Sequence, residues 1–282
     1  MKIIECPRDA MQGLEQFIPT DLKVAYINQL LKVGFDTIDF GSFVSHKAIP
    51  QMRDTAEVLE QLDYTQTGSK LLAIVANPRG AEEACKYKEI NYLGFPLSIS
   101  ETFQQRNTNK SIGEALNTVN EIQDLCKKYN KKQVVYISMG FGNPYSDPYE
   151  VAIVEQFTDI LVTLEIEIIS LADTIGVSEP TQIEYLFKSL TKKFPRIEFG
   201  AHLHSTPETR LEKIEAAYRS GCQRFDGAIK GFGGCPMAKD DLVGNMATET
   251  ILSFLDSKNE APELNRNELG IALQMADQIF PH

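Results

Sequence analysis

The chain has 282 residues, of which 43% are hydrophobic and 24% are charged, and its formal net charge is -11. This composition is typical of a globular protein with a sizeable core. The acidic balance argues against nucleic acid as the main partner, because phosphate binding needs a basic face. No apolar run reaches the roughly 18 residues that cross a bilayer, and Pro7-Arg8-Asp9 comes too early for a secretory signal peptide. We expect a cytoplasmic protein with no membrane partner.

Short apolar segments alternate with longer amphipathic ones along almost the whole chain, which is the pattern of repeated strand and helix units around a parallel sheet. The predicted strands are Lys2–Cys6, Asp36–Gly41, Lys70–Ala76, Asn91–Phe95, Gln133–Met139, Glu167–Leu171, Glu198–His202 and Cys222–Ala228. An apolar stripe predicts a helix over Thr20–Val33, with Gly34 as its stop. Another helix is expected to open at Thr206-Pro207 and to close at Gly221.

Eight such units predict a (β/α)8 TIM barrel, which takes roughly 250 residues. Residues 245–282 are expected to add a C-terminal extension of two helices, separated by the polar break Ser257–Glu260 and Pro262. No repeat or linker divides the chain, so residues 1–282 are expected to form a single domain. A doubly wound sheet would alternate in the same way, but it often carries a glycine-rich loop after its first strand. Pro7-Arg8-Asp9 stands there instead.

Two of the four histidines, His202 and His204, end the seventh predicted strand. Residues i and i+2 of a strand point to the same face, so both imidazoles would converge at its carboxyl end. Imidazole is the commonest metal ligand in proteins, and Asp9, just after the first strand, is a third candidate ligand. Taken alone, the pair is also compatible with histidines that only make hydrogen bonds.

Reactive groups of such barrels cluster at the carboxyl ends of the strands. Seven polar residues fall at or just beyond the predicted ends, namely Arg8, Asp9, Asp39, Asp173, His202, His204 and Lys230. We therefore expect the reaction site at that rim. The five widely spaced cysteines predict reduced thiols, and among them Cys235 stands apart because it lies between glycines and a proline.

Five separated motifs occur in one order along the chain. They are Pro7-Arg8-Asp9-Ala10-Met11-Gln12, then Ser42-Phe43-Val44-Ser45 with Lys47 and Ile49-Pro50-Gln51-Met52, then Asp173-Thr174-Ile175-Gly176-Val177, then His202-Leu203-His204, and finally Gly233-Gly234-Cys235-Pro236 with Gly244-Asn245-Met246-Ala247-Thr248-Glu249. In this order the sequence resembles the 3-hydroxy-3-methylglutaryl-coenzyme A lyase family over nearly its full length. That family belongs to a superfamily of metal-dependent barrels that make or break carbon-carbon bonds.

The resemblance implies a divalent ion, Mg²⁺ or Mn²⁺, bound by Asp9, His202, His204 and Asn245. Mixed nitrogen and oxygen ligands suit such ions. The ion would chelate a hydroxyl and a carboxylate of an acyl-coenzyme A substrate and lower the pKa of the hydroxyl. Loss of that proton would cleave a 3-hydroxy-3-methylglutaryl-type thioester into acetoacetate and acetyl-coenzyme A.

The resemblance also implies catalytic roles. Arg8 would stabilise the enolate oxygen, an effect of about 3 kcal/mol for one well-placed donor; the alternative is a structural ion pair with Asp9. Asp39 stands where the family has a glutamate that braces this arginine. Cys235 would assist proton transfer, whereas the residues alone favour an inert loop thiol. Asp173 would orient substrate or carry a proton, or else it closes a turn.

Further residues are expected to contact the substrate. Ser42 and Lys47 would meet the acyl-coenzyme A, although Lys47 is also compatible with a plain solvated lysine, and Gln12 and Thr174 complete the substrate-binding set. Asn245 is also a suitable helix N-cap.

Several residues near the predicted site depart from the family pattern. Asp39 is one methylene shorter than glutamate, roughly 1.5 Å, and Ala10, Gly13 and Ser205 are further differences. The acyl substrate is therefore left open, as is the pathway, leucine breakdown or another. The competing hypotheses are a related aldolase or synthase of the same superfamily and a catalytically impaired acyl-coenzyme A-binding homologue. A homodimer is possible.

Overall fold

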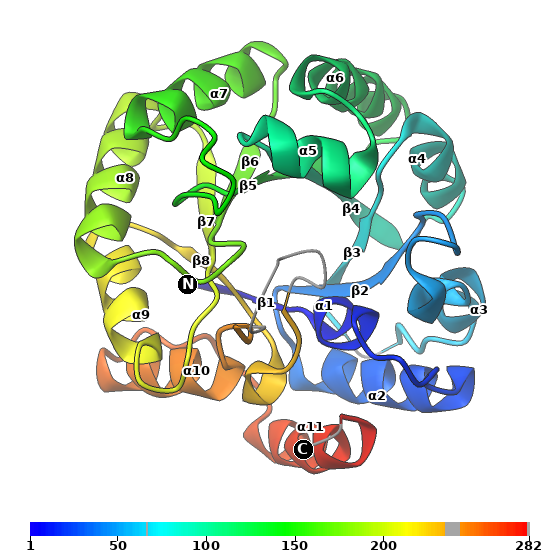
Figure 1. Ribbon diagram of the computed structural model, residues 1–282. Helices are drawn as coiled ribbons and strands as arrows, with labels where there is room; N and C mark the ends of the chain where they lie inside the picture. The colour runs from blue at the N-terminus through cyan, green and yellow to red at the C-terminus, as the bar shows by residue number, and fades with distance from the viewer. Residues whose placement is uncertain (66, 235–242, 281–282) are drawn as a thin grey trace.

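A computed structural model describes residues 1–65, 67–234 and 243–280. Eight parallel strands pair in chain order and close into a barrel with helices around it (Figure 1). The strands are β1 (Lys2–Glu5), β2 (Thr37–Ser42), β3 (Lys70–Ile74), β4 (Ile90–Ser98), β5 (Lys132–Ser138), β6 (Ile168–Ala172), β7 (Glu198–His202) and β8 (Arg224–Gly227). The predicted (β/α)8 TIM barrel is confirmed.

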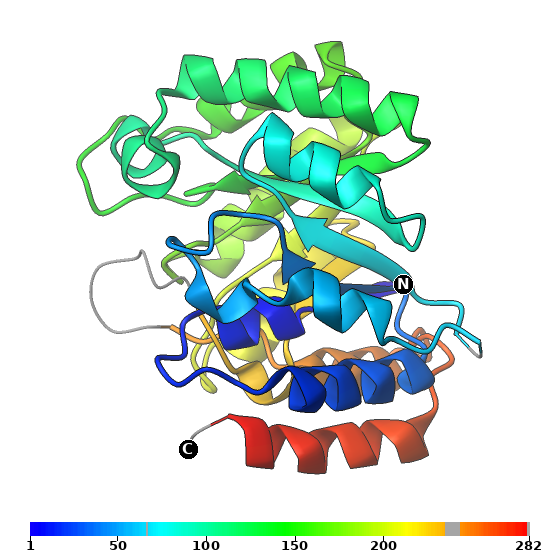
Figure 2. The same cartoon turned by 90° about the vertical axis from the view of Figure 1, so that its right-hand side faces the viewer.

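The helices surround the barrel as an outer layer. They are α1 (Pro7–Gln12), α2 (Thr20–Val33), α3 (Thr55–Glu60), α4 (Pro78–Cys85), α5 (Glu101–Thr108), α6 (Ile112–Lys128), α7 (Val151–Thr163), α8 (Pro180–Lys193), α9 (Arg210–Arg219), α10 (Thr248–Ser257) and α11 (Arg266–Ile279), with short 3₁₀ helices η1 (Pro50–Met52) and η2 (Ile229–Gly231). The C-terminal helix α11 packs on the outside of α2 (Figures 1 and 2). In the part of the chain that the structure describes, no helix is long and apolar enough to span a bilayer.

Helix boundaries show where local sequence signals succeed and fail. Helix α2 has the predicted bounds, and Gly34 follows it in the left-handed conformation with φ 87°. The helix expected to open at Thr206 begins at Arg210 instead. Thr206 and Thr209 form a turn closed by the side chain, in which the Thr206 amide donates to Thr209 Oγ1 at 3.1 Å. This local hydrogen bond competes with the helical pattern.

The inside of the barrel is divided into an apolar and a polar half. One apolar cluster comes from the alternating residues of four neighbouring strands, namely Leu72, Ile74, Tyr92, Val134, Tyr136 and Ile168. The intervening residues of these strands pack against the helices. On β2, β6, β7 and β8 the same alternation brings polar side chains inside the barrel, including Asp39, Ser170, His202, Arg224 and Asp226. The polar half lies below the carboxyl-terminal rim that was expected to hold the site.

Glu5 links the first strand to the C-terminal part of the chain. Its side chain is fully buried, and its two carboxyl oxygens accept hydrogen bonds from the Ile229 amide at 2.9 Å and from Thr248 Oγ1 at 2.6 Å. Burial raises the pKa of Glu5 to about 8, and hydrogen bonding to Thr248 opposes this only in part. A carboxyl group with such a pKa keeps its proton in the fold at neutral pH.

We expect Glu5→Gln to remove a pH-dependent contribution to stability. An ordinary glutamate has a pKa of 4.5, so between that value and about 8 the folded protein keeps a proton that the unfolded chain has lost. The free energy of unfolding should therefore fall as pH rises through this window, by at most about 1.4 kcal/mol per pH unit, and the glutamine variant should lack this fall. Urea unfolding with EDTA across the window measures the difference. Wild-type and variant curves that run parallel would contradict it.

Candidate metal and active site

Arg8 is held between two carboxylates at the mouth of the barrel. It lies on α1, which follows β1 directly and starts at Pro7. Its Nε lies 3.2 and 3.1 Å from the two Asp39 oxygens, one NH group lies 2.5 Å from Asp39 Oδ2, and the other lies 2.8 Å from Asp9 Oδ1. Asp39 therefore reaches Arg8 in spite of its short side chain, and the ion pair between Arg8 and Asp9 is present as well.

The two carboxylates have different electrostatic surroundings. Burial raises the pKa of Asp39 above its usual value, and Arg8 offsets this only in part. Burial also acts on Asp9, but there Arg8, followed by His202 and a hydrogen bond from Asn245, prevails and lowers its pKa. Asp9 is therefore the carboxylate that the fold holds in its ionised form.

Asp9, His202 and His204 gather as a possible metal site. Each offers one ligand atom, and these atoms all lie within 4.8 Å of one another. Nε2 of His204 is buried and has no hydrogen-bond partner among the described residues. Burial and the neighbouring His202 lower the pKa of His204 to about 4, so its imidazole is neutral. A buried, neutral imidazole with an unused ring nitrogen beside an ionised carboxylate fits a divalent cation.

Asn245 adjoins this group through a β-bridge with His204. Its Nδ2 donates to Asp9 Oδ2 at 2.7 Å and to the Phe232 carbonyl at 2.9 Å. Because both N–H groups are used, Oδ1 is the atom that it could offer to a cation. The alternative role as a helix N-cap is not observed, because α10 starts at Thr248 with Ala247 in the capping position.

Asp226 orients His202, although the motifs did not single it out. Its Oδ2 lies 3.1 Å from Nδ1 of His202, which leaves Nε2 for the side where Asp9 and His204 lie. Burial would lower the pKa of His202, but the hydrogen bond and charge of Asp226 prevail and raise it. The sequence signal was the charged alternation Arg224-Phe225-Asp226 within a buried strand.

Cys6 lies in a second group with His202 and Asp226. Burial and the nearby carboxylates, Asp226 first among them, raise the pKa of the Cys6 thiol well above its usual value. The thiolate is the form that binds metals, so Cys6 is a poor ligand and His202 is better placed in the group with Asp9.

Asp173 braces the loop after β6. Its carboxylate accepts hydrogen bonds from the Val177 amide at 2.8 Å, from Ser178 Oγ at 2.5 Å and from Lys213 Nζ at 2.9 Å. Lys213 is itself buried and also donates to the carbonyl oxygen of His204 at 2.9 Å. These contacts are those of a structural brace, while the catalytic role expected for Asp173 stays a prediction. Lys213 was missed because α9 gives it the sequence pattern of an exposed lysine.

The expected substrate-binding residues lie in different environments. Gln12 Nε2 donates to Asp9 Oδ1 at 2.6 Å. Thr174 Oγ1 accepts from the Met139 amide at 2.8 Å, and Ser42 is buried at the end of β2. Lys47 is exposed in the loop after β2. Cys235 lies outside the described residues.

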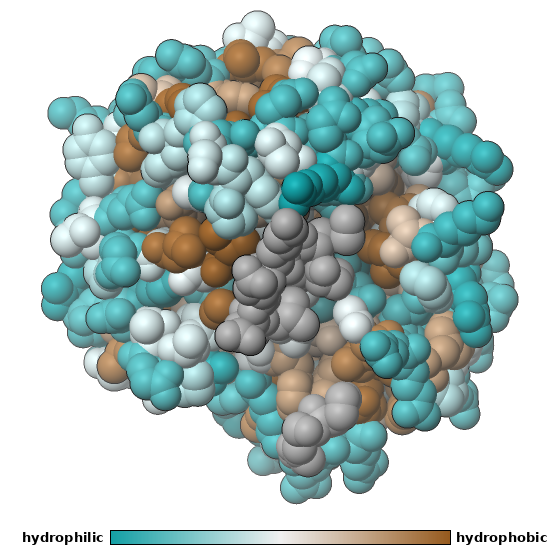
Figure 3. All heavy atoms as spheres, viewed as in Figure 1, coloured by the Kyte–Doolittle hydropathy of each residue, from teal (hydrophilic) through white to brown (hydrophobic). Residues whose placement is uncertain are grey.

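The carboxyl ends of the strands face the viewer in Figure 1, and Figure 3 shows the same side. There, apolar side chains gather on both sides of the centre and hydrophilic ones surround them (Figure 3). Such a mixture of apolar area with a few convergent polar groups is usual for small-molecule sites.

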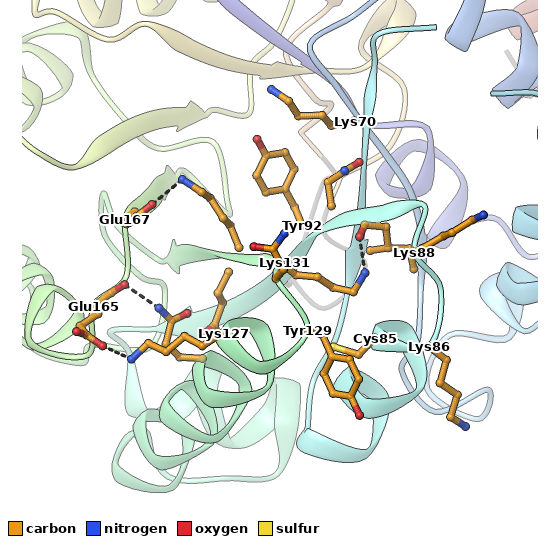
Figure 4. A pocket seen from close by; sticks show the side chains of 16 residues that line it. Lys70, Cys85, Lys86, Lys88, Tyr92, Lys127, Tyr129, Lys131, Glu165 and Glu167 are labelled. Atoms are coloured by element: carbon orange, nitrogen blue, oxygen red, sulfur yellow. Dashed lines mark hydrogen bonds and ion pairs between the residues drawn. The ribbon is translucent and has the colours of Figure 1, made fainter. Parts of the chain in front are cut away.

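A hollow of about 890 Å³ lies at the opposite end of the barrel, where β3, β4 and β5 begin (Figure 4). Six lysines line it, namely Lys70, Lys86, Lys88, Lys127, Lys131 and Lys132. Five of them pair with carboxylates, and Lys131 donates to two backbone carbonyls. The positive charge of this hollow is thus largely compensated, and among the described residues none of the expected site residues lines it. The chemistry belongs to the other end.

Comparison with known proteins agrees with this geometry. Residues 2–275 match a family model described as HMGL-like. A hydroxymethylglutaryl-CoA lyase from Bacillus subtilis is 36% identical over 250 residues, which cover 89% of this chain and 83% of the relative. A 3-hydroxy-3-isohexenylglutaryl-CoA/hydroxy-methylglutaryl-CoA lyase from Pseudomonas aeruginosa is 33% identical over 253 residues, 89% of this chain and 82% of the relative. The structure of an HMG-CoA lyase from Acinetobacter baumannii in complex with coenzyme A and 3-methylmalate has a TM-score of 0.91 at 28% identity, covering 99% of this chain and 90% of that chain.

A closed barrel with two imidazoles and an ionised carboxylate at the carboxyl ends of its strands defines a barrel enzyme whose site can hold a metal ion. The chain belongs to the HMGL-like family. It is a carbon-carbon lyase of the hydroxymethylglutaryl-CoA lyase type.

We expect Lys213→Met to lower the free energy of unfolding by about 3–5 kcal/mol, because it leaves the carboxylate of Asp173 buried without its cation. The double variant with Asp173→Asn removes both charges and should recover part of this loss. Urea unfolding measures all three proteins. Lys188→Met is the matched control, because its exposed pair with Glu184 on α8 contributes only about 0.3–0.5 kcal/mol. A loss no larger than that of the control would refute the bracing role.

Proposed function

We propose that this protein cleaves a 3-hydroxy-3-methylglutaryl-type acyl-coenzyme A into acetoacetate and acetyl-coenzyme A in a reaction that depends on Mg²⁺ or Mn²⁺. The observation that carries the proposal is the grouping of Asp9, His202 and His204 within 4.8 Å, directly beside the guanidinium of Arg8. Such a site combines cation ligands with a fixed positive charge. Cleavage next to a thioester needs both.

Asp9, His202, His204 and Asn245 would hold the ion. When bound, it would act as a Lewis acid that makes the tertiary hydroxyl of the substrate easier to deprotonate. Gln12 holds Asp9 through the hydrogen bond to Oδ1, so it would keep that carboxylate in place while the substrate binds.

Arg8 would stabilise the negative charge that develops during cleavage. Loss of the hydroxyl proton lets the alkoxide collapse to the ketone of acetoacetate, and the electrons of the broken carbon-carbon bond pass to the enolate of acetyl-coenzyme A. A guanidinium fixed in advance by Asp39 and Asp9 needs little reorganisation to meet that charge, which is the condition for a large electrostatic effect. Protonation of the enolate carbon then completes acetyl-coenzyme A.

The remaining roles follow the family pattern. Cys235 would carry the proton during turnover, and Asp173 would orient the substrate or take part in proton transfer. Ser42, Lys47 and Thr174 would meet the acyl-coenzyme A. We further propose that residues 1–282 work as one catalytic domain in the cytoplasm, and that the protein can form a homodimer.

We expect purified protein to release acetyl-coenzyme A when Mg²⁺ or Mn²⁺ is added and to stop when EDTA removes the ion. Both hydroxymethylglutaryl- and isohexenylglutaryl-type thioesters belong in the assay, because the names of the relatives include both. Failure with every 3-hydroxy-3-carboxymethyl-type thioester would overturn the proposal. Stoichiometric metal without turnover would instead favour a related aldolase, whereas little bound metal would favour the impaired acyl-coenzyme A-binding homologue.

We expect His204→Ala to abolish stoichiometric Mn²⁺ binding and to lower kcat by well over about 100-fold, because a ligand matters more than the outer partners that cost about 10–100-fold. Mn²⁺ titration calorimetry and the acetyl-coenzyme A assay measure the two effects. His46→Ala is the control, because His46 is exposed in the loop after β2. Unchanged Mn²⁺ binding in His204→Ala would remove His204 from the ligand set.

We expect Cys235→Ala to lower kcat by about 10²–10⁴-fold, the usual share of a proton-transferring group. Mn²⁺ affinity should stay close to the wild-type value, because the cysteine is placed outside the ligand set. Steady-state kinetics and calorimetry on the same preparation separate the two quantities. Normal turnover in this variant would show that Cys235 is an inert thiol without a role in proton transfer.

A further inference from the structure

A row of charged side chains runs along the inside of the barrel, from the beginning of the strands to the candidate metal site. Lys2 pairs with Glu198 at 2.5 Å, and Glu198 lies 3.3 Å from one NH group of Arg224. Nε of Arg224 lies 3.8 Å from Asp226 Oδ1, and Asp226 Oδ2 lies 3.1 Å from Nδ1 of His202. The two carboxylates of this row thus alternate with its cationic side chains.

A fully buried arginine such as Arg224 is energetically unfavourable unless its charge and N–H groups are paired. Its side chain has an exposed fraction of 0%, and Nε and one NH group have no hydrogen-bond partner among the described residues. Burying a charge with unmet hydrogen bonds is unfavourable even when the charge is paired. If the side chain served only to fill space, an apolar residue would be more stable at this position.

The neighbouring strands leave room for this side chain. A Cβ at Gly200 on β7 would lie 3.0 Å from Cδ of Arg224 and 3.0 Å from Oγ of Ser170. Such distances are tighter than almost all natural Cβ contacts. Glycine at position 200 therefore admits the arginine stem to the inside of the barrel.

We propose that Arg224 is a positioning residue for the metal centre, which acts through Asp226 to hold His202 with Nε2 turned toward Asp9 and His204. Oδ1 of Asp226 has no hydrogen-bond partner among the described residues, so the guanidinium is the group that fixes this side of the carboxylate. The other oxygen then accepts from Nδ1 of His202. A hydrogen bond at one ring nitrogen selects the tautomer and leaves the other nitrogen free for a metal.

This inference rests on the metal site of the proposed function, and its test separates the two. Metal-free protein is studied by long-range ¹H–¹⁵N correlation NMR at a pH where His202 is neutral, which reports the ring nitrogen that carries the proton. Mn²⁺ titration calorimetry reports the affinity. The wild-type protein should show the Nδ1–H tautomer of His202 and one bound ion. If it binds no Mn²⁺, the proposed site fails, while the tautomer still decides the role of Arg224.

In Arg224→Met the apolar stem is kept and the charge is lost. We expect a mixture of His202 tautomers and a Kd for Mn²⁺ that rises about 10–100-fold, as for other outer partners of metal ligands. Arg224→Lys keeps the charge and should restore most of the tautomer and affinity. Lys2→Met is the control, because it removes a cation from the far end of the same row without touching Asp226. It should leave both readouts unchanged.

The pathway through Asp226 is tested by a double variant. If Arg224 acts through this carboxylate, Arg224→Met with Asp226→Asn should bind Mn²⁺ no more weakly than Asp226→Asn alone. Additive losses would overturn the proposal, and so would a folded Arg224→Met with wild-type tautomer and affinity. If the methionine variant does not fold, Arg224→Gln, which keeps N–H groups without the charge, takes its place in both comparisons with the same expected outcomes.

Discussion

The buried guanidinium of Arg8 is the interaction on which the rest of the site depends. Asp39 and Asp9 are both enclosed at the barrel mouth, and two carboxylates in such surroundings repel one another unless a cation lies between them. Arginine suits this place because its planar fork can hold two carboxylates in fixed directions. Asp9 then lies where Gln12 and Asn245 also reach it. The N-terminal helix and the loop before α10 meet at this one carboxylate.

A second buried arginine lies between two carboxylates deeper inside the barrel. Arg224 stands between Glu198 and Asp226 as Arg8 stands between Asp39 and Asp9. The polar half of the interior faces an apolar half built by β3, β4, β5 and β6. The apolar half provides packing, while the polar half keeps imidazoles and carboxylates in fixed orientations below the rim. Stability and chemistry thus use largely different strands of one barrel, and β6 contributes to both halves through Ile168 and Ser170.

The sequence predicts the barrel because apolar strands and amphipathic helices alternate along it. It also brings together the candidate ligands Asp9, His202 and His204, because two of them stand at i and i+2 of one strand and the third follows another. Both ends of helix α2 were predicted correctly, because its apolar stripe ends at a glycine that takes a positive φ. Most strand bounds differ by one or two residues, because apolar runs continue into the connecting loops. The prediction that a helix begins at Thr206 was wrong, because a hydrogen bond from the Thr206 amide to the Thr209 side chain forms a turn there instead. Lys213, Arg224 and Asp226 were missed because their importance lies in buried partners far along the chain.

Asp39 contacts Arg8 although its side chain is short. Its carboxylate is one methylene shorter than the glutamate of the family pattern, yet Asp39 Oδ2 lies 2.5 Å from an NH group of Arg8. The pairing of β2 with β3 shifts register between Asp39 and Gly41. Such an irregularity re-aims nearby side chains. The irregularity thus lies directly at the residue whose carboxylate reaches Arg8.

The same arginine also separates the two carboxylates by function. Arg8 and His202 offset the burial of Asp39 only in part, and the charge of Asp9 adds to the rise, so the pKa of Asp39 stays raised. The pKa of Asp9 is lowered, because Arg8, His202 and a hydrogen bond from Asn245 outweigh its burial. Environments that push paired titratable groups apart commonly mark different roles. Asp39 is suited to orient the arginine, and Asp9 is suited to meet a cation. Because this division depends on His202 and Asn245, which lie far along the chain, it would not follow from the Arg8-Asp9 motif in isolation.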